Sequence, residues 1–456
     1  MTEIGNEGDI MDLDSIAGAR APQNSAEKRV LRKVVIASVI GNGLEWFDFV
    51  SYGYFATMIA RAFFPADSYL SIMLTFATFA VGFVVRPIGG IVLGAYADRH
   101  GRRKALTLLI GMMAFGTLSL GLTPSYATIG IAAPMIVILG RIVQGISIGG
   151  EFASATALLV EYVPENRRML FGSFQMSAQA VGRVFAAGTG LLVITAFAPT
   201  TVHAWAWRLP FLIGALVGPF GFYIRYRMAE SPEYEHLQDA TPDLVKAPVR
   251  TVFSRFRIPL VCAFGLGIVG TAVTYVWNNY LPVYVVRELH LPLWEDLFGV
   301  LLTSAIDIFI CVLGGWLGDR IGAYRMFFFL TAVTVLVSYP LFAYVLADPS
   351  FTRLLEAQLV ALTLYGLASG VGPGMLASLF PVEVRSTGMA ISYNVPVTIF
   401  GGFSPLTITW MIHTTKSDLV PAFYLIAAGI LSVVVVGSMQ ATLRRRAAFR
   451  VSTAPG

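Results

Sequence analysis

The sequence predicts an all-α integral membrane protein with twelve transmembrane helices, arranged as two six-helix pseudo-repeat bundles. Hydrophobic residues make up 56% of the 456 residues and charged residues only 13%, whereas soluble domains carry roughly 25% charged residues. A spanning helix needs about 20 mainly apolar residues, because its backbone polar groups must bond within the helix once they leave water. Such stretches recur at residues 33–62, 70–97, 105–123, 129–162, 171–197, 207–228, 256–286, 296–317, 325–346, 354–380, 387–413 and 418–443.

The longest polar connection divides these spans six and six. It is rich in acids and prolines. The polar tail before the first span lacks the early basic region and short apolar run of a signal peptide, and its composition is typical of a disordered extension. The expected domains are an N-terminal tail at 1–32, a first bundle at 33–228, a linker at 229–255, a second bundle at 256–443 and a C-terminal tail at 444–456.

Lysine and arginine gather in alternate connections. They occur before the first span, in the even-numbered turns and after the last span, whereas the odd-numbered loops hold few cations. By the positive-inside rule, both termini and the linker are expected in the cytoplasm. The same distribution accounts for the net charge of +5, so the expected partner is the lipid bilayer and not nucleic acid.

An integral-membrane enzyme is the alternative class, and it would need a catalytic constellation near the membrane surface. The sequence has no P-loop lysine motif and no metal-binding histidine pair. Its two cysteines, Cys262 and Cys311, lie inside apolar spans and are interpreted as small core residues. No enzymatic activity, metal or bound cofactor is therefore expected.

The two halves carry a repeated motif. Gly94-x-x-x-Asp98-Arg99-x-Gly101 follows the second span, and Gly315-x-x-x-Asp319-Arg320-x-Gly322 follows the eighth. A weaker repeat pairs the region of Arg168 with that of Arg385. Internal duplication, with a binding site between the halves, is typical of many transporters.

The motifs resemble those of a known family over residues 33 to 440. GAYADRHGRRK (94–104) and Arg141-x-x-Gln144-Gly145 resemble the loop and fourth-helix motifs of the major facilitator superfamily. GNGLEWFDFVSYG (41–53), RPIGG (86–90), GGE (149–151), FPVEVRSTGMAISYN (380–394) and GGFSP (401–405) resemble its metabolite:H+ symporters. The resemblance implies alternating access driven by a proton gradient, in a bacterial inner membrane. That family includes carriers of citrate, α-ketoglutarate, shikimate and proline/betaine.

Charged residues near the turns are candidates for a conformational latch, because a switch needs an element with two stable arrangements. The alternative is that these charges only anchor the topology. The second copy has Ala323-Tyr324-Arg325 where the first has basic residues, so the two halves are not expected to form a symmetric latch. The candidate latch residues are Asp98, Arg99, Arg102, Arg141, Asp319 and Arg320.

Carboxyl groups inside the spans are candidates for proton coupling, because charge at mid-membrane is costly and usually functional. Glu45, Asp48 and Tyr52 fall at i, i+3 and i+7, on one helical face. Neighbouring acids and desolvation raise a carboxyl pKa, so one of them could hold a proton. In span four, a polar stripe from Arg141 to Glu151 suits proton relay, with helix packing as the alternative.

Arginines inside the spans are candidates for anion binding. Arg86 adjoins Pro87, and Arg183 continues a polar line with Gln175 and Gln179 at i, i+4 and i+8. Each arginine could instead form an internal ion pair, Arg86 with Asp48 or Arg183 with an acid of another span.

Neutral polar groups of the second half are expected to orient the ligand. Thr271, Tyr275, Asn278 and Pro282 are predicted to share a face of span seven, and Tyr393 and Asn394 lie in span eleven. Asp307 in span eight could carry a proton, pair with Arg183, or select against highly charged substrates.

Together these patterns predict proton-coupled uptake of a small organic anion, a di- or tricarboxylate, by a monomer. The alternatives are a zwitterionic osmolyte or a cyclic acid as substrate, export, and a nutrient receptor. The expected proton-coupling residues are Glu45, Asp48, Glu151 and Asp307. The expected substrate-binding residues are Tyr52, Arg86, Gln175, Gln179, Arg183, Tyr275, Asn278, Tyr393 and Asn394.

Overall fold

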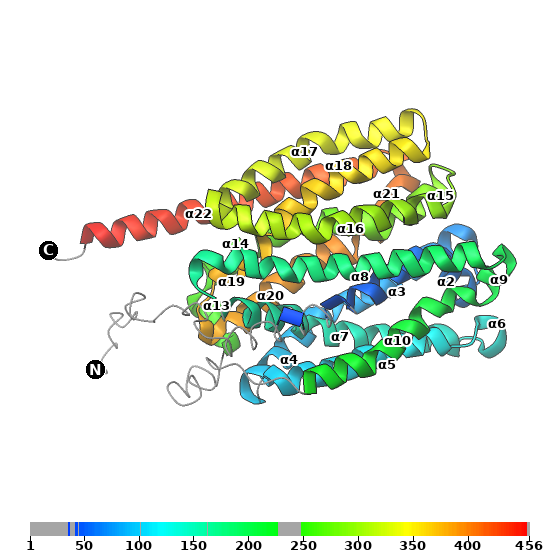
Figure 1. Ribbon diagram of the computed structural model, residues 1–456, viewed down its shortest axis with the longest axis horizontal. Helices are drawn as coiled ribbons and strands as arrows, with labels where there is room; N and C mark the ends of the chain where they lie inside the picture. Colours follow the sequence, from blue (N-terminus) through cyan, green and yellow to red (C-terminus); the bar gives the residue numbers. More distant parts are fainter. Residues whose placement is uncertain are drawn as a thin grey trace.

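The computed structural model describes residues 35–36, 42–43, 45–100, 102–161, 163–226 and 248–453, and every regular element within these ranges is a helix (Figure 1). Eight segments of this part of the chain are long and apolar enough to cross a membrane. One of them, Leu293–Ala347, contains two successive helices, and Thr107–Leu122 and Ala206–Leu216 are shorter apolar helices. With helical residues 45–63, these segments account for the twelve predicted spans.

The first bundle begins with helical residues 45–54, whose side chains are almost all buried. Asp67 caps the next long helix, because its side chain accepts hydrogen bonds from the amides of Tyr69 and Leu70, both at 3.0 Å. The helices are α2 (Ala56–Phe63), α3 (Ser68–Val84), α4 (Arg86–His100), α5 (Arg102–Leu122), α6 (Tyr126–Ile129), α7 (Ala132–Glu161), α8 (Arg168–Ala196), α9 (Pro199–Ala204) and α10 (Leu209–Tyr226).

The second bundle contains three π-helical segments, η3 (Val276–Tyr280), η4 (Gly318–Gly322) and η6 (Val397–Gly402). Such segments are often found at functional sites. The α-helices are α13 (Pro248–Arg255), α14 (Arg257–Tyr275), α15 (Leu281–Arg287), α16 (Leu293–Leu317), α17 (Ala323–Ala347), α18 (Phe351–Ser369), α19 (Gly372–Ser378), α20 (Arg385–Pro396), α21 (Ser404–Thr415) and α22 (Val420–Thr453).

Part of the predicted linker and most of the predicted C-terminal tail are helical. Residues 248–255 of the linker form α13, where Val252 is buried against Val384 and Ile391. Helix α22 continues through the predicted C-terminal tail to Thr453 and projects beyond the bundle (Figure 1). The predicted N-terminal tail at 1–32 and linker residues 229–247 lie outside the described residues.

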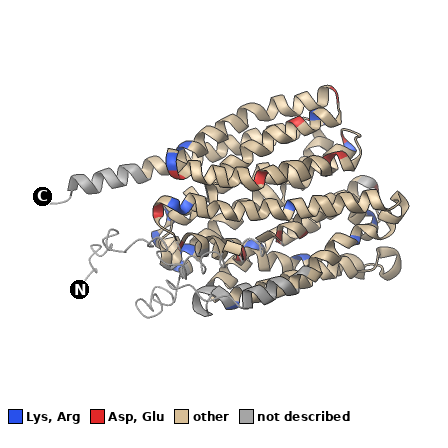
Figure 2. Ribbon diagram, in the orientation of Figure 1, with Lys and Arg blue, Asp and Glu red and all other residues tan. Residues whose placement is uncertain are grey.

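The long helices run roughly parallel to one axis, and α8 of the first bundle lies beside α16 of the second (Figure 1). Lysine and arginine residues are concentrated at one end of the molecule (Figure 2). We call this the basic end; it includes Arg167, Arg168, Arg320, Arg325 and Arg385, at the turns where α8, α17 and α20 begin. The α2–α3, α15–α16 and α21–α22 turns lie at the opposite end.

Candidate functional site

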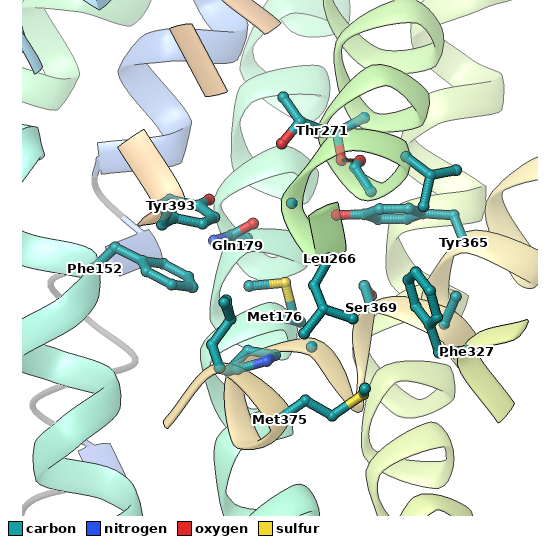
Figure 3. Close-up of a pocket in the computed structure, with 18 of the residues that line it drawn as sticks. Phe152, Met176, Gln179, Leu266, Thr271, Phe327, Tyr365, Ser369, Met375 and Tyr393 are labelled. Carbon is teal, nitrogen blue, oxygen red and sulfur yellow. Dashed lines mark hydrogen bonds between the residues drawn. The ribbon is translucent and has the colours of Figure 1, made fainter. Parts of the chain in front are cut away.

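A pocket lies between the two bundles. Its walls come from helical residues 45–54, α7 and α8 of the first bundle, and from α14, α17, α18, α19 and α20 of the second. Gln179, Thr271, Ser369 and Tyr393 are among the side chains that surround the cavity in Figure 3. A site bounded by both halves is what alternating access requires.

The pocket is aromatic and uncharged. Phe152 and Tyr393 stack in parallel, with ring centroids 3.7 Å apart, and Trp46, Tyr275 and Tyr365 also line the cavity. Among the described lining residues there is no Lys, Arg, Asp or Glu. Gln179 presents a buried Nε2 without a hydrogen-bond partner, so it can donate to a ligand.

The shared polar face predicted for span seven ends at Tyr275. Thr271 and Tyr275 line the pocket, but Asn278 does not. Segment η3 begins at Val276, and its wider turns change the direction of the following side chains. Asn278 instead donates from Nδ2 to the carbonyl of Thr274, at 3.1 Å. The prediction of one face from Thr271 to Pro282 is therefore wrong beyond Tyr275.

Two other predicted ligand residues, Tyr52 and Asn394, make structural contacts, and a third, Gln175, does not reach the pocket. Tyr52 donates to the carbonyl of Thr75 at 3.0 Å. Asn394 donates from Nδ2 to the carbonyl of Gly149 at 2.7 Å, which ties α20 to α7. Gln175 is fully buried and its side chain has no partner, although it does not line the pocket.

Arg183 and Asp307 form a buried ion pair between the bundles. The Nη2 atom of Arg183 contacts Oδ2 of Asp307, and its Nε donates to Ser304 Oγ at 3.3 Å. Cys311 Sγ lies 3.3 Å from Oδ1 of Asp307 and 3.4 Å from Ser369 Oγ, and Ser369 lines the pocket. The ion pair is thus connected to the cavity wall by two short side chains.

A second, smaller pocket inside the first bundle brings together Glu45, Asp48 and Glu151. Asp48 Oδ2 accepts hydrogen bonds from Arg141 Nη1 at 3.2 Å and from Gln144 Nε2 at 2.9 Å. All three carboxyl groups are at most 5% exposed. The acids predicted on spans one and four therefore line one common pocket, and none of them lines the central pocket.

Arg86 lies behind the pocket wall. Its guanidinium carbon is 3.9 Å from the centre of the Phe83 ring and 4.5 Å from that of Phe49. It also lies beside Tyr275, whose ring lines the pocket. The ion-pair partner of Asp48 is Arg141 and not Arg86, so the predicted ion pair between Arg86 and Asp48 is wrong in this conformation.

Outside the spans, Glu288 lies between α15 and α16 at the end opposite the basic end. Burial raises the pKa of this carboxyl above its usual range and the Asp418 carboxylate raises it further, while Arg287 and His290 lower it. Glu288 therefore takes up a proton at a higher pH than an exposed glutamate does.

The model of the Major Facilitator Superfamily matches residues 39–405 of this chain. The chain belongs to the major facilitator superfamily. This transporter is 34% identical over 419 residues to the citrate-proton symporter of Klebsiella pneumoniae, covering 91% of this chain and 92% of that protein. It is 32% identical over 428 residues to the proline/betaine transporter of Salmonella typhimurium, covering 91% of this chain and 84% of the relative.

The fold agrees with solved structures. A proton:xylose symporter, XylE, bound to 6-bromo-6-deoxy-D-glucose matches with a TM-score of 0.73 at 15% identity, covering 91% of this chain and 96% of that one. The twelve-helix fold and the resemblance to metabolite:H+ symporters are confirmed. Members of this superfamily are transporters, so the expectation that the chain is not an enzyme is confirmed as well.

The basic end of this major facilitator transporter joins the two bundles. Asp319 accepts hydrogen bonds from the backbone amides of Met169 and Leu170, both at 3.0 Å, and so caps α8 from the other half. Arg320 lies over Trp316, with its guanidinium carbon 3.9 Å from the ring centre. Of the other candidate latch residues, Arg141 binds Asp48 deep in the bundle, and the side chains of Asp98, Arg99 and Arg102 lie outside the described part.

Sequence reasoning missed two buried pairs. Glu161 of α7 and Arg385 of α20 approach to 3.4 Å at the basic end, and Gln358 of α18 donates to Asp296 of α16 at 2.8 Å. The weak repeat around Arg385 was a signal for the first pair. Asp296 was placed at the edge of a predicted span, which concealed its complete burial.

Proposed function

We propose that this transporter is a monomeric proton-coupled symporter that takes up a small carboxylate-bearing metabolite across the bacterial inner membrane, with both termini in the cytoplasm. The concentration of lysine and arginine at the basic end supports this orientation (Figure 2). The energy source proposed is the proton gradient. Two relatives that cover most of the chain are named as a citrate-proton symporter and a proline/betaine transporter, and the substrates in both names bear carboxylates.

The uncharged, aromatic lining of the central pocket is the observation on which the proposed substrate class rests. Aromatic ring faces attract substituted ammonium groups, and the cavity presents Trp46, Phe152 and Tyr393. The Gln179 amide and the hydroxyls of Thr271 and Tyr365 can bind a carboxylate at the same time. We therefore favour a compact zwitterion, such as proline or a betaine, in the conformation described.

A di- or tricarboxylate such as citrate or α-ketoglutarate is the second candidate. It is favoured by two buried arginines near the pocket, Arg86 and Arg183, and by the citrate-proton symporter relative. A multiply charged anion would lie in a cavity without a cation in its described lining, so Arg183 would first have to leave Asp307. Breaking the buried Arg183–Asp307 pair would cost free energy, because Asp307 would lose its countercharge. A zwitterion can bind while that pair stays intact.

For proton coupling we propose the Asp48 carboxyl together with Glu151 and Glu45. Asp48 lies beside Arg141, so binding and release of a proton would make and break a buried ion pair. Such a pair is suited to coupling because it has two distinct charge states within one rigid bundle. Asp307, paired with Arg183, is the corresponding group between the bundles.

The test is a ligand panel on purified protein, followed by flux in proteoliposomes. Proline, glycine betaine, citrate, α-ketoglutarate and shikimate are compared for their effect on melting temperature, since a ligand that binds only the folded protein raises it. A shift with proline or betaine and none with citrate supports the zwitterion. A shift with citrate alone selects the second candidate. Uptake that survives collapse of both the pH gradient and the membrane potential would contradict proton coupling.

A further inference from the structure

Asp296 is an enclosed carboxyl group in the first turn of α16. Its side chain is fully buried, and no Lys, Arg or His of the described residues forms a salt bridge with it. Oδ1 accepts a hydrogen bond from Gln358 Nε2 at 2.8 Å, while Oδ2 is buried with no partner. Asp48 and Asp307 differ, because each of them contacts an arginine.

Gln358 also has one unsatisfied atom. Its Oε1 is buried without a partner and lies against Gly299 of α16, where a β-carbon would overlap it. An ionised carboxylate and an amide oxygen are both acceptors only, so neither can satisfy the other. One proton on Oδ2 would change this, because the acid could then donate to Oε1 while Oδ1 accepts from Nε2.

Among the residues that the structure describes, no cation pairs with Asp296, so a negative charge there has no ionic partner. From the first bundle, the Tyr54 phenol is near enough to interact electrostatically with Asp296, and its hydroxyl is buried without a partner. A β-carbon at Gly190 of α8 would lie 3.3 Å from Leu297 and 3.8 Å from Tyr54, which places Tyr54 close to this turn. On α16 itself, Glu295 is a second acid, and Arg183 forms its ion pair with Asp307.

We propose that Asp296 is an additional proton-binding site of this transporter, and that it holds its proton in a cyclic acid–amide pair with Gln358. The ligand is a single proton, and the site is separate from the acids of the first bundle. A role of Asp296 in coupling rests on the proposed function, proton-coupled symport. The neutral acid needs no countercharge. Its proton on Oδ2, donated to Gln358 Oε1, gives a partner to both buried atoms that lack one.

The position of Asp296 suits exchange with the compartment at the end opposite the basic end. Asp296, Ser304, Asp307 and Cys311 are spaced by eight, three and four residues, which places them on one face of α16. This face meets α8, since Ser304 and Asp307 contact Arg183. Asp296 lies three turns, about 16 Å, from Asp307 towards that end.

The test is the infrared carbonyl band of protonated carboxyl groups in purified, substrate-free protein near pH 7. We expect a band in the wild type that is lost in Asp296→Asn. The band should persist in Glu356→Gln, a matched control that removes an exposed carboxyl of α18 two residues from Gln358. It should also persist in Asp48→Asn, which separates it from the first bundle.

Gln358→Leu provides a second measurement if Asp296→Asn does not fold. Loss of the amide should shift the band to higher frequency, because Oδ1 no longer accepts a hydrogen bond. A band unchanged in Asp296→Asn, or one unchanged in Gln358→Leu, overturns the proposal. Because the measurement needs no substrate, failure of proton-coupled symport would appear separately, as wild-type flux that ignores the proton gradient while the band remains.

Discussion

Arg183 of α8 contacts Asp307 of α16 through Nη2 and Oδ2, and this buried ion pair joins the first bundle to the second. Both side chains are 2% exposed. Desolvation of two charges is costly, and their mutual attraction offsets that cost only while both partners are present. Of the roles that the sequence left open for Arg183, an internal pair is the one seen in this conformation.

Neutralising one member of this pair should therefore destabilise the protein strongly. Arg183→Gln leaves Asp307 as an uncompensated buried charge, so we expect a loss of about 3–5 kcal/mol in folding stability. The double variant Arg183→Gln/Asp307→Asn removes both charges and should recover most of that loss. Melting temperatures of the single and double variants in detergent measure the effect.

A different result would assign Arg183 to the substrate. If the ligand supplies the countercharge, Arg183→Lys keeps the charge but loses the bidentate fork. Substrate affinity would then weaken about tenfold or more at an unchanged melting temperature, since charged hydrogen bonds contribute roughly 1.5–3 kcal/mol. That combination would contradict the structural role of the pair.

Asp48→Asn should abolish accumulation against a gradient. Asparagine keeps the size of the side chain but cannot release a proton, so Arg141 and Gln144 would face a neutral partner at all times. Exchange of substrate across the membrane without net accumulation should persist. Radiolabelled uptake and counterflow in proteoliposomes distinguish the two processes. The control is Asp348→Asn, at a side chain that is largely exposed. Full accumulation by Asp48→Asn would rule out Asp48 as an obligatory proton carrier.

Phe152→Leu should weaken binding of a zwitterion. The ring of Phe152 stacks on Tyr393 in the pocket wall, and loss of one cation–π contact of about 0.5–2 kcal/mol corresponds to a roughly 2- to 30-fold higher Kd. Phe309→Leu, at a side chain that is 74% exposed on the outside of the bundle, is the matched control. Equal Kd values for the two variants in a binding titration would argue against aromatic recognition.

Asp319→Asn should favour opening at the basic end. The asparagine side chain has one acceptor oxygen, so only one of the two amides of Met169 and Leu170 keeps its partner. Loss of about 1 kcal/mol would shift a two-state equilibrium about fivefold. The measurement is the labelling rate of Ser369→Cys, in the pocket wall, after Cys262 and Cys311 are replaced by serine. An unchanged rate would mean that this cap does not hold the bundles together.

The linear sequence was sufficient for the fold. Apolar length and the charge of alternate loops are properties of the chain itself, and the bilayer converts them directly into spans and orientation. Ionisable residues within spans were also visible, because they interrupt an apolar run. Asp48, Arg86, Arg183 and Asp307 were all found in this way.

Partners between helices were decided only by the tertiary structure. Asp48 pairs with Arg141, 93 positions away, and not with Arg86, while Glu161 pairs with Arg385 across 224 positions. Such pairs depend on which helices are neighbours and on their rotation, and helical periodicity restricts a side chain to a face without naming the face opposite. Segment η3 turns Asn278 out of the pocket for a related reason, since a local change of pitch leaves no mark in hydropathy. The same limit hid Asp296 and Gln358, whose complete burial arises only when α16 and α18 pack together.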